Sequence, residues 1–234
     1  MKTVKTAFAH VDTWVFDLDN TLYPPHADLW PKIDERITSY IATRFALDRV
    51  AARAMQKAYY HEYGTSLSGL MQRHSVDPHE FLDFVHKIDR SSLLPNHALG
   101  AVLAALPGRK LVFTNGSHYH AHETASALDI IHHFDGIFDI VAAELVPKPH
   151  AVTYERFFKK HDVNPKSAAM FEDIVKNLTV PHAVGMKTVL VIPQTGAVDH
   201  RDEGDRSLGS EEDLKNPEVD FVTADLTAFL NTLV

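Results

Sequence analysis

The chain has 234 residues, 45% of them hydrophobic, which is enough to bury the core of one large domain or of a domain with an insertion. The formal net charge of -8 argues against binding to a nucleic acid polymer or an anionic membrane, so a phosphate-bearing ligand must be held by locally placed cations. Cysteine is absent, which excludes disulfides and thiolate metal sites, and no signal peptide or apolar run of membrane-spanning length is visible. We therefore expect a cytoplasmic protein without membrane contact.

Six short runs rich in apolar and β-branched residues predict the strands of a parallel sheet. They are Thr13 to Phe16, Lys110 to Thr114, Ile137 to Ala142, Ala168 to Phe171, Lys187 to Ile192 and Asp220 to Thr223. Most of the runs are apolar without alternation, which is typical of strands buried on both faces. Residues 118–128, 151–161 and 175–184 have the length of crossover helices. This order predicts an α/β fold with a doubly wound, Rossmann-like parallel sheet.

The stretch from Leu22 to Pro107 interrupts this alternation, because no convincing strand occurs in it. Apolar residues recur every four positions from Leu29 to Phe45, which predicts a helix with one apolar face. Further helices are expected at residues 48–63, 78–88 (with Asp77 as N-cap) and 96–105.

These helices predict a second module inserted after the first strand. We expect a helical cap of residues 23–107 and an α/β core of residues 1–22 and 108–234, because Pro24-Pro25 and Pro107-Gly108 mark boundaries. A module in this position would lie over whatever binds at the end of the first strand. The acidic segment from Gln194 to Pro217 predicts a surface loop.

Two carboxylates, Asp17 and Asp19, stand two residues apart directly behind the apolar run that ends at Phe16. Packing does not explain such a pair, because two negative charges about 4 Å apart repel by about 1 kcal/mol in water and about 4 kcal/mol near a protein surface. A cation has to offset this repulsion, and a divalent metal that prefers oxygen ligands is the natural candidate. The pair therefore indicates a binding site at the end of the first strand.

Polar residues that can carry chemistry follow the other predicted strands as well. The second strand is followed by Thr114, Asn115 and Gly116, the third by Lys148, and the fourth by Glu172 and Asp173. In open α/β sheets, ligands bind outside the carboxyl ends of the strands, so these side chains converge with Asp17 and Asp19 on one edge. Phosphoryl transfer needs such a set: a nucleophile, an acid or base, donors for the phosphoryl oxygens and a metal.

These residues resemble the motifs of a known family. The chain is similar to the haloacid dehalogenase (HAD) superfamily of aspartate-nucleophile phosphatases, whose first motif, DxDx[TV], matches residues 17–21. The remaining motifs match Thr114 (second), Lys148-Pro149 with Tyr154 (third), and Glu172-Asp173 with Asn177 (fourth). One departure is Ile174, which stands where many relatives have serine. All four motifs occur in order, so the resemblance covers essentially the whole chain.

The resemblance implies a role for each matched residue. Asp17 would attack phosphorus and form an aspartyl phosphate, and Asp19 would protonate the leaving oxygen and then take a proton from water. The phosphoryl oxygens would be bound by Thr114, Asn115, Gly116 and Lys148, of which Thr114 and Lys148 are also catalytic. Mg²⁺ would be held by Asp17, the backbone carbonyl of Asp19, Asp173 and waters. Glu172 would orient Lys148, and Asn177 would support the metal waters.

Within the superfamily, the chain resembles the microbial pyrimidine 5′-nucleotidases. The similar segments are Phe16 to Pro24, Tyr63 to Leu67, Gly69 to Met71, Asp77 to Leu82 and His86 to Asp89. This resemblance implies hydrolysis of a nucleoside monophosphate, with UMP and CMP as the leading substrates, under a cap that closes over the site. The cap residues expected near the leaving group are Tyr63, Gly64, Thr65 and Met71. The glycines of this segment are equally explained as helix breaks.

Three other functions stay open on these motifs. A broad-specificity phosphatase acting on small metabolites, such as sugar phosphates or phosphoglycolate, would share every core residue. A haloacid dehalogenase would use Asp17 without Mg²⁺, but those relatives lack the second acid, so Asp19 argues against it. A non-catalytic module that binds a phosphate ligand would be favoured if a matched residue were missing, and none is.

A group of histidines suggests a competing metal site. His118 and His122 are four residues apart and would share a helical face, as zinc ligands do, while His120 would point elsewhere. His132 and His133 follow nearby, but no acidic partner stands at a zinc-protease spacing. We therefore interpret the segment as the solvated start of a helix.

Overall fold

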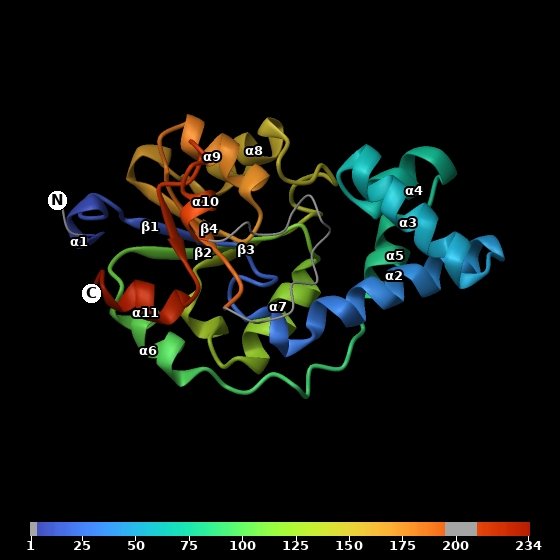
Figure 1. Cartoon of the computed structure of the whole chain (residues 1–234), viewed down its shortest axis with the longest axis horizontal. Helices are drawn as coiled ribbons and strands as arrows, with labels where there is room; N and C mark the ends of the chain where they lie inside the picture. Colours follow the sequence, from blue (N-terminus) through green and yellow to red (C-terminus); the bar gives the residue numbers. More distant parts are fainter. Residues whose placement is uncertain (1–3, 195–209) are drawn as a thin grey trace.

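The computed structural model describes residues 4–194 and 210–234, and its strands form one parallel sheet (Figure 1). The strands are β1 (Thr13–Phe16), β2 (Arg109–Phe113), β3 (Gly136–Phe138), β4 (Ala168–Glu172), β5 (Lys187–Val191) and β6 (Phe221–Thr223). Their order is β3-β2-β1-β4-β5-β6, so the chain adds strands on one side of β1 and then on the other. In sheets of this kind, the crevice where the order reverses is the binding site.

Successive residues of the central strands belong to two separate apolar layers, one on each face of the sheet. In β1, Trp14 and Phe16 lie in one layer and Val15 lies in the other. Phe16 also stacks on Phe171 of the neighbouring β4, with ring centroids 4.8 Å apart. Because side chains alternate along a strand, two covered faces require apolar residues at every position, which explains the continuous runs.

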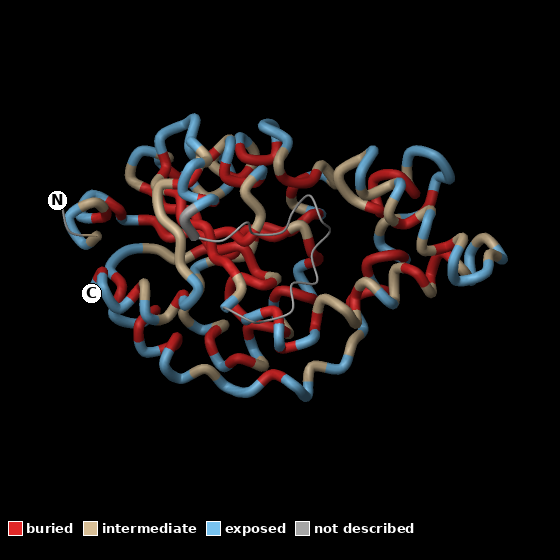
Figure 2. Tube along the Cα trace, viewed as in Figure 1, coloured by how far each residue is buried: buried red, intermediate tan, exposed pale blue. Residues whose placement is uncertain are grey.

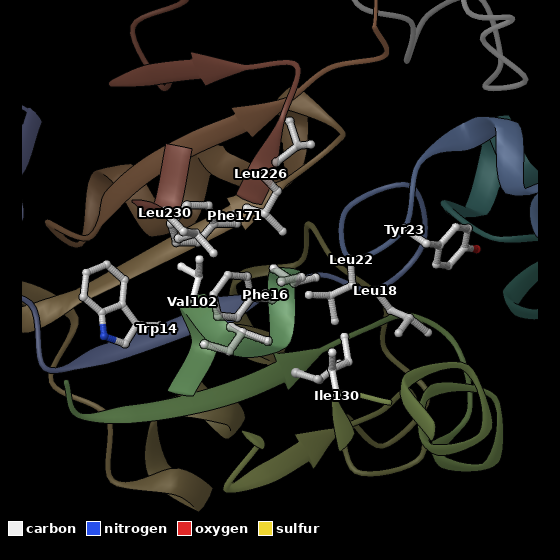
Figure 3. Close-up of a cluster of buried hydrophobic side chains, with 14 of the residues drawn as sticks. Trp14, Phe16, Leu18, Leu22, Tyr23, Val102, Ile130, Phe171, Leu226 and Leu230 are labelled. Atoms are coloured by element: carbon white, nitrogen blue, oxygen red, sulfur yellow. The ribbon is translucent and has the colours of Figure 1, made fainter. Parts of the chain in front are cut away.

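Helices cover both faces of the sheet (Figure 1). The layer that contains Trp14 is closed by α1 (Val4–Ala7), α6 (His97–Ala105), α7 (His118–Ala127), η2 (Ile131–His133) and α11 (Leu226–Asn231). The opposite layer is closed by α8 (Ala151–His161), η4 (Val175–Leu178) and α9 (Thr179–Ala183). Figure 3 shows Val102 of α6 and Leu230 of α11 close to Phe16 and Phe171. The short elements η3 (Pro165–Ser167) and α10 (Ser210–Asp213) complete this part.

The remaining helices form a group beside the sheet (Figure 1). After η1 (Pro25–Ala27) come α2 (Leu29–Phe45), α3 (Arg49–Tyr63), α4 (Ser66–His74) and α5 (Pro78–Val85). Each of α3, α4 and α5 begins at a side-chain cap, supplied by Asp48, Thr65 and Asp77 respectively. The four helices share an apolar cluster of their own, which includes Ile41 and Phe81. Figure 2 shows this burial as red stretches on the helices as well as along the strands.

The predicted fold class, a doubly wound parallel sheet with helices on both sides, is confirmed. Several elements differ from expectation. The third strand ends at Phe138 because the carboxylate of Asp139 accepts hydrogen bonds from the backbone N–H groups of His118 and Ala142, both at 2.9 Å, which starts a turn. The helix expected at residues 175–184 is broken into η4 and α9.

Proline explains that break. Pro181 has no N–H to donate to the carbonyl of Asn177, which instead accepts a hydrogen bond of 2.7 Å from the hydroxyl of Tyr154.

Further helices were not predicted. The helix α4 has no counterpart among the predicted elements. Of the loop expected from Gln194 to Pro217, residues 195–209 lie outside the described residues, and α10 corrects the prediction for Ser210–Asp213.

The helix α6 packs differently from α2 to α5. Leu99, Val102 and Leu103 lie in the sheet-side layer, whereas the cluster of the other helices contains no residue of α6. The chain returns to the sheet through Gly108, whose positive φ of 81° and close approach to the carbonyl of Asp12 exclude a side chain. The cap predicted at residues 23–107 stays a prediction. The packing of α6 on the sheet concerns its second boundary, because α6 lies within the predicted cap but not in the apolar cluster of α2 to α5.

Candidate active site

The residues expected to carry chemistry meet at the carboxyl edge of the three central strands. Asp17 follows β1 directly, Thr114 follows β2, and Asp173 follows β4. The backbone of Asp17 is held in the sheet by a hydrogen bond of 2.9 Å from its N–H to the carbonyl of Phe171. A loop between β3 and α8 brings Lys148 to the same edge. These residues line one pocket between the sheet and the helices α2 to α5.

Lys148 is the centre of a buried charged network. Its Nζ donates hydrogen bonds to Oδ1 of Asp17 at 2.7 Å, Oε1 of Glu172 at 2.7 Å and the carbonyl of Phe113 at 2.9 Å. All three ammonium donors are therefore used, which a buried lysine requires. Asn115 fixes the backbone beside it, because its Oδ1 accepts from the N–H of Lys148 at 2.8 Å and its Nδ2 donates to the carbonyl at 3.2 Å.

One lysine does not balance the acids around it. The pKa of Asp17 is raised to about 7, because burial and the charges of Glu172 and Asp19 raise it by more than Lys148 lowers it. Burial alone would lower the pKa of Lys148, but the carboxylates of Asp17 and Glu172 raise it above its ordinary value. A further positive charge near Asp17 would be needed to keep this carboxylate fully ionised at neutral pH.

The arrangement of the acids fits a hard divalent cation. One carboxylate oxygen from each of Asp17, Glu172 and Asp173 lies within 4.8 Å of the others. Both oxygens of Glu172 are already engaged, Oε1 by Lys148 and by Asn177 at 2.7 Å, and Oε2 by the N–H of Ile174 at 2.8 Å. Asp17 and Asp173 are therefore the better ligands.

A buried acceptor beside the acids also fits a hydrated cation. Oδ1 of Asn177 is buried and has no hydrogen-bond partner in the part of the chain that the structure describes. Its Nδ2 donates to Glu172, which settles the orientation of the amide. An unsatisfied buried acceptor is costly, and a water in the shell of a metal ion would satisfy it.

Asp19 lies in a different environment from Asp17. Its Oδ1 accepts hydrogen bonds from the hydroxyl of Tyr23 and from Nε2 of His120, the latter at 2.8 Å. Burial alone would raise the pKa of Asp19, but His120 and Tyr23, which donate hydrogen bonds to it, lower it below its ordinary value. Environment therefore separates the pKa values of the two carboxylates: without a bound cation, the pKa of Asp17 is raised and that of Asp19 is lowered.

Thr114, Asn115 and Gly116 line the same pocket at the end of β2. Oγ1 of Thr114 accepts a hydrogen bond of 2.9 Å from the N–H of Gly116, which folds the segment into a tight turn. A side chain at Gly116 would crowd the ring of His120 at 3.1 Å and Oγ1 of Thr114 at 3.2 Å. The turn therefore presents these three residues to the pocket that Asp17 also lines.

The pocket continues onto the helices, where its lining mixes apolar and polar side chains. The apolar residues include Ile33, Ile37, Phe81, Leu82 and Val85, and the polar ones include Asp34, Gln56, Lys57 and Tyr60. Among the four cap residues expected near a leaving group, the structure brings Gly64 and Thr65 to the pocket. Tyr63 and Met71 are not part of its lining, because Met71 packs against the cluster inside the helical group and Tyr63 packs edge-on against Tyr59.

With this geometry in place, comparison with known proteins assigns the family. Residues 11–185 match the haloacid dehalogenase-like hydrolase family. The chain belongs to this family. Phosphate metabolism protein 8 of Saccharomyces cerevisiae is 27% identical over 193 residues, which are 75% of this chain. The chain spans 60% of the length of that yeast relative.

Solved structures of this family share the fold. A HAD phosphatase from Thermococcus onnurineus has a TM-score of 0.59 at 14% identity, with 95% of this chain and 98% of that chain covered. An L-2-haloacid dehalogenase has a TM-score of 0.59 at 14% identity, with 96% and 100% covered. Because a phosphatase and a dehalogenase are equally similar, the fold of the family does not decide between their reactions.

Within this HAD-like hydrolase, the structure corrects one interpretation of the sequence. His120 is fully buried and bonded to Asp19, so it does not belong to a solvated helix start. His118 and His122 on the same helix are exposed. The inward face of α7 also holds Ala121 and Ala125, and these alanines were the signal that the face of His120 packs against the sheet.

Tyr23, Arg90 and His86 are further residues of the site that the motifs did not reveal. Figure 3 shows Tyr23 at the end of the apolar cluster farthest from Trp14, and its hydroxyl reaches Asp19. Arg90 contacts the opposite nitrogen of His120.

In the described residues, no helix combines the length and the apolar character needed to cross a membrane.

Proposed function

We propose that this HAD-like hydrolase is a Mg²⁺-dependent phosphomonoester hydrolase that works through an aspartyl phosphate. The observation that carries the proposal is the second acid. Asp19 lines the same pocket as Asp17 and has its own hydrogen-bond partners, whereas the dehalogenases of the superfamily lack an acid at this position. A dehalogenase needs no proton donor for a leaving halide, but a phosphatase needs one for a leaving alkoxide.

Asp17 is the proposed nucleophile. One of its oxygens forms a bond to phosphorus while the bond from phosphorus to the leaving oxygen breaks. Lys148 lies 2.7 Å from Oδ1 and offsets the negative charge that the substrate brings, and Glu172 holds Lys148 in this place. The pKa of about 7 for Asp17 means that a bound cation would increase its ionised fraction.

Asp19 is the proposed acid and base. It gives a proton to the leaving oxygen in the first half of the reaction and takes one from the attacking water in the second. Water then forms the new bond to phosphorus, the bond to Asp17 breaks, and inorganic phosphate leaves. Thr114 and the backbone N–H of Asn115 line the same pocket and are the proposed donors to the phosphoryl oxygens, while Gly116, whose N–H donates to Oγ1 of Thr114, shapes the turn that holds them.

Asp17, Asp173 and the backbone carbonyl of Asp19 are the proposed ligands of Mg²⁺, with Asn177 accepting from a water of its shell. When bound, the ion supplies positive charge to the phosphoryl oxygens and to Asp17. The chain itself positions the ion, because Asn20 donates to Oδ2 of Asp173 at 3.4 Å and both oxygens of Glu172 are held by other donors.

The proposed substrate is a pyrimidine nucleoside 5′-monophosphate such as UMP or CMP. Two findings support a phosphate ester: the name of the yeast relative refers to phosphate metabolism, and the motifs resemble those of pyrimidine 5′-nucleotidases. The helices α2 to α5 supply a side of the pocket with both apolar and polar residues, which would face the leaving group. We propose that the cap consists of these four helices and ends before α6, which packs on the sheet.

A substrate panel tests this function. The purified chain with Mg²⁺ is expected to release phosphate from UMP and CMP faster than from purine 5′-monophosphates, sugar phosphates or phosphoglycolate. Equal rates across the panel would make it a broad-specificity phosphatase instead. Absence of phosphate release from every compound, with the protein folded and Mg²⁺ bound, would remove the enzyme proposal altogether.

A further inference from the structure

A buried pair of histidines lies behind the proposed acid and base. The rings of His120, on α7, and His86, just after α5, stack with centroids 4.7 Å apart and planes at 10°. His120 is fully buried, and only 5% of the surface of His86 is accessible to solvent. Nδ1 of His86 is bonded to Oγ of Ser117 at 2.9 Å, and this hydroxyl also accepts from the backbone of His120 at 3.2 Å. Packing and hydrogen bonds therefore allow the ring of His120 only one orientation.

The protonation of His120 follows from its second neighbour. Nδ1 lies 3.0 Å from Nη2 of Arg90, and a guanidinium only donates hydrogen bonds. Nδ1 must therefore be the acceptor, which places the ring proton on Nε2. Nε2 lies 2.8 Å from Oδ1 of Asp19, so His120 is the donor of that hydrogen bond.

The guanidinium of Arg90 is itself fixed by hydrogen bonds to four acceptors. Besides His120, it donates to the carbonyls of His86 and Ile88 and to Oγ1 of Thr124, each at 3.2 Å. These contacts come from two different parts of the chain, α7 and the segment after α5. The direction of the hydrogen bond from His120 to Asp19 is thus built into the fold.

Both identified donors to Asp19 use the same oxygen. Tyr23 and His120 donate to Oδ1, while no hydrogen bond to Oδ2 is seen among the described residues. A carboxylate oxygen that accepts two hydrogen bonds is a poor place for a proton, so a proton transferred to or from Asp19 would reside on Oδ2. The orientation of Asp19 then decides whether Oδ2 meets the leaving oxygen.

We infer that His120 is a positioning residue for proton transfer: its Nε2–H holds Oδ1 of Asp19, with Tyr23, so that Oδ2 carries the proton. The inference rests on the proposed function. In the first half of the reaction, the Oδ2 proton passes to the leaving oxygen as its bond to phosphorus breaks. In the second half, a proton of the attacking water passes to Oδ2. His120 neither gains nor loses a proton in either half.

The test compares two leaving groups in rapid-mixing experiments that follow the first release of the leaving group. An alkyl phosphate needs a proton on its leaving oxygen, whereas p-nitrophenyl phosphate releases a stable anion without one. For His120→Leu, we expect release from the alkyl phosphate to slow on the order of 100-fold and release of p-nitrophenolate to stay nearly unchanged. His120→Gln is expected to restore part of the loss, because its amide nitrogen can donate from the place of Nε2.

Two further variants complete the test. Tyr23→Phe removes only the second donor to Oδ1, so the same preference for the activated substrate should appear with a smaller loss. His122→Leu changes an exposed histidine on the same helix and should leave both rates unchanged. Circular dichroism and thermal melting establish that each variant is folded. If His120→Leu fails to fold, the two leaving groups are compared in His120→Gln and Tyr23→Phe.

Several outcomes would overturn the inference. Equal slowing of both substrates in Tyr23→Phe and the His120 variants would mean a merely structural role, and unchanged rates for both would mean no role. Failure of the unmodified protein to release either leaving group would count against the proposed phosphatase function, and the inference would fall with it. The two failures are thus distinguishable in one set of measurements.

Discussion

The two sides of the pocket differ in the residues that line them. On the sheet side, Lys148 and Glu172 are buried, and their charged atoms have hydrogen-bond partners at 2.7 to 2.9 Å. On the helical side, apolar residues such as Ile33, Ile37 and Phe81 alternate with polar ones such as Gln56 and Lys57. Under the proposed function, the sheet edge determines the reaction through fixed geometry, whereas the helices select the leaving group by shape and by this mixture of apolar and polar contacts.

The largest effect should come from the centre of the sheet side. Asp17→Asn keeps the size of the side chain and removes the nucleophile, so phosphate release is expected to fall by about four orders of magnitude. Steady-state release from UMP measures the loss, and thermal melting confirms that the variant is folded. Activity close to that of the unmodified protein would show that Asp17 does not attack phosphorus.

Removal of the buried ammonium should destabilise the sheet side itself. Lys148→Met leaves Asp17 and Glu172 facing one another without their cation, so the free energy of unfolding is expected to fall by about 3 to 5 kcal/mol. Urea denaturation measures the change. Lys215→Met is the matched control, because Lys215 pairs with Glu212 on the surface and such pairs contribute at most about 1 kcal/mol. Similar losses in both variants would contradict the network described for Lys148.

Metal binding should stabilise the same side of the pocket. At a concentration of Mg²⁺ 100 times its dissociation constant, the free energy of unfolding is expected to rise by about 2.7 kcal/mol, and a chelator should abolish both this gain and the activity. Asp173→Asn should lose the gain because Asp173 is a proposed ligand. Asp83→Asn, at an exposed acid of α5, should retain it. A gain that survives in Asp173→Asn would place the ion elsewhere.

A change on the helical side should affect selection and leave the chemistry alone. Ile37→Ala removes apolar contact with the leaving group, so KM for UMP is expected to rise about tenfold. The inhibition constant of inorganic phosphate, which reports only the phosphate site, should not change. Val50→Ala, at an exposed position of α3, serves as the control. An equal effect of Ile37→Ala on phosphate inhibition would mean that the two sides of the pocket are not separable.

The smallest expected effect concerns the charge of Asp17 in metal-free protein. Because its folded pKa of about 7 lies above the ordinary 3.8, the folded state holds this proton more tightly, and the resulting stability is lost as pH rises. Relative to Asp17→Asn, the unmodified protein should lose about 1 kcal/mol of unfolding free energy between pH 6 and pH 7. Denaturation at several pH values measures the difference. A difference that stays constant between pH 6 and pH 7 would show that the pKa of Asp17 is not raised to this range.

Much of the sheet side could be read from the sequence because its signals are local. A continuous apolar run predicts a buried strand, and a polar residue directly behind it must lie at the edge of the sheet. That reasoning placed Asp17, Thr114 and Asp173 at one edge, where the structure has them. It failed for the segment around Asp139, whose side chain ends the strand by capping a turn.

The sequence by itself determined the fold class, the order of the motifs and the edge where they meet, because strand burial and parallel connections follow from local patterns. Only the tertiary structure decided that His120 faces Asp19, that Arg90 sets its tautomer, and that α6 packs on the sheet. The reason is physical: the contact between His120 and Asp19 joins residues 101 positions apart. A local pattern such as Ala121 and Ala125 can indicate which face of α7 is buried, but it does not specify which distant residue that face will meet.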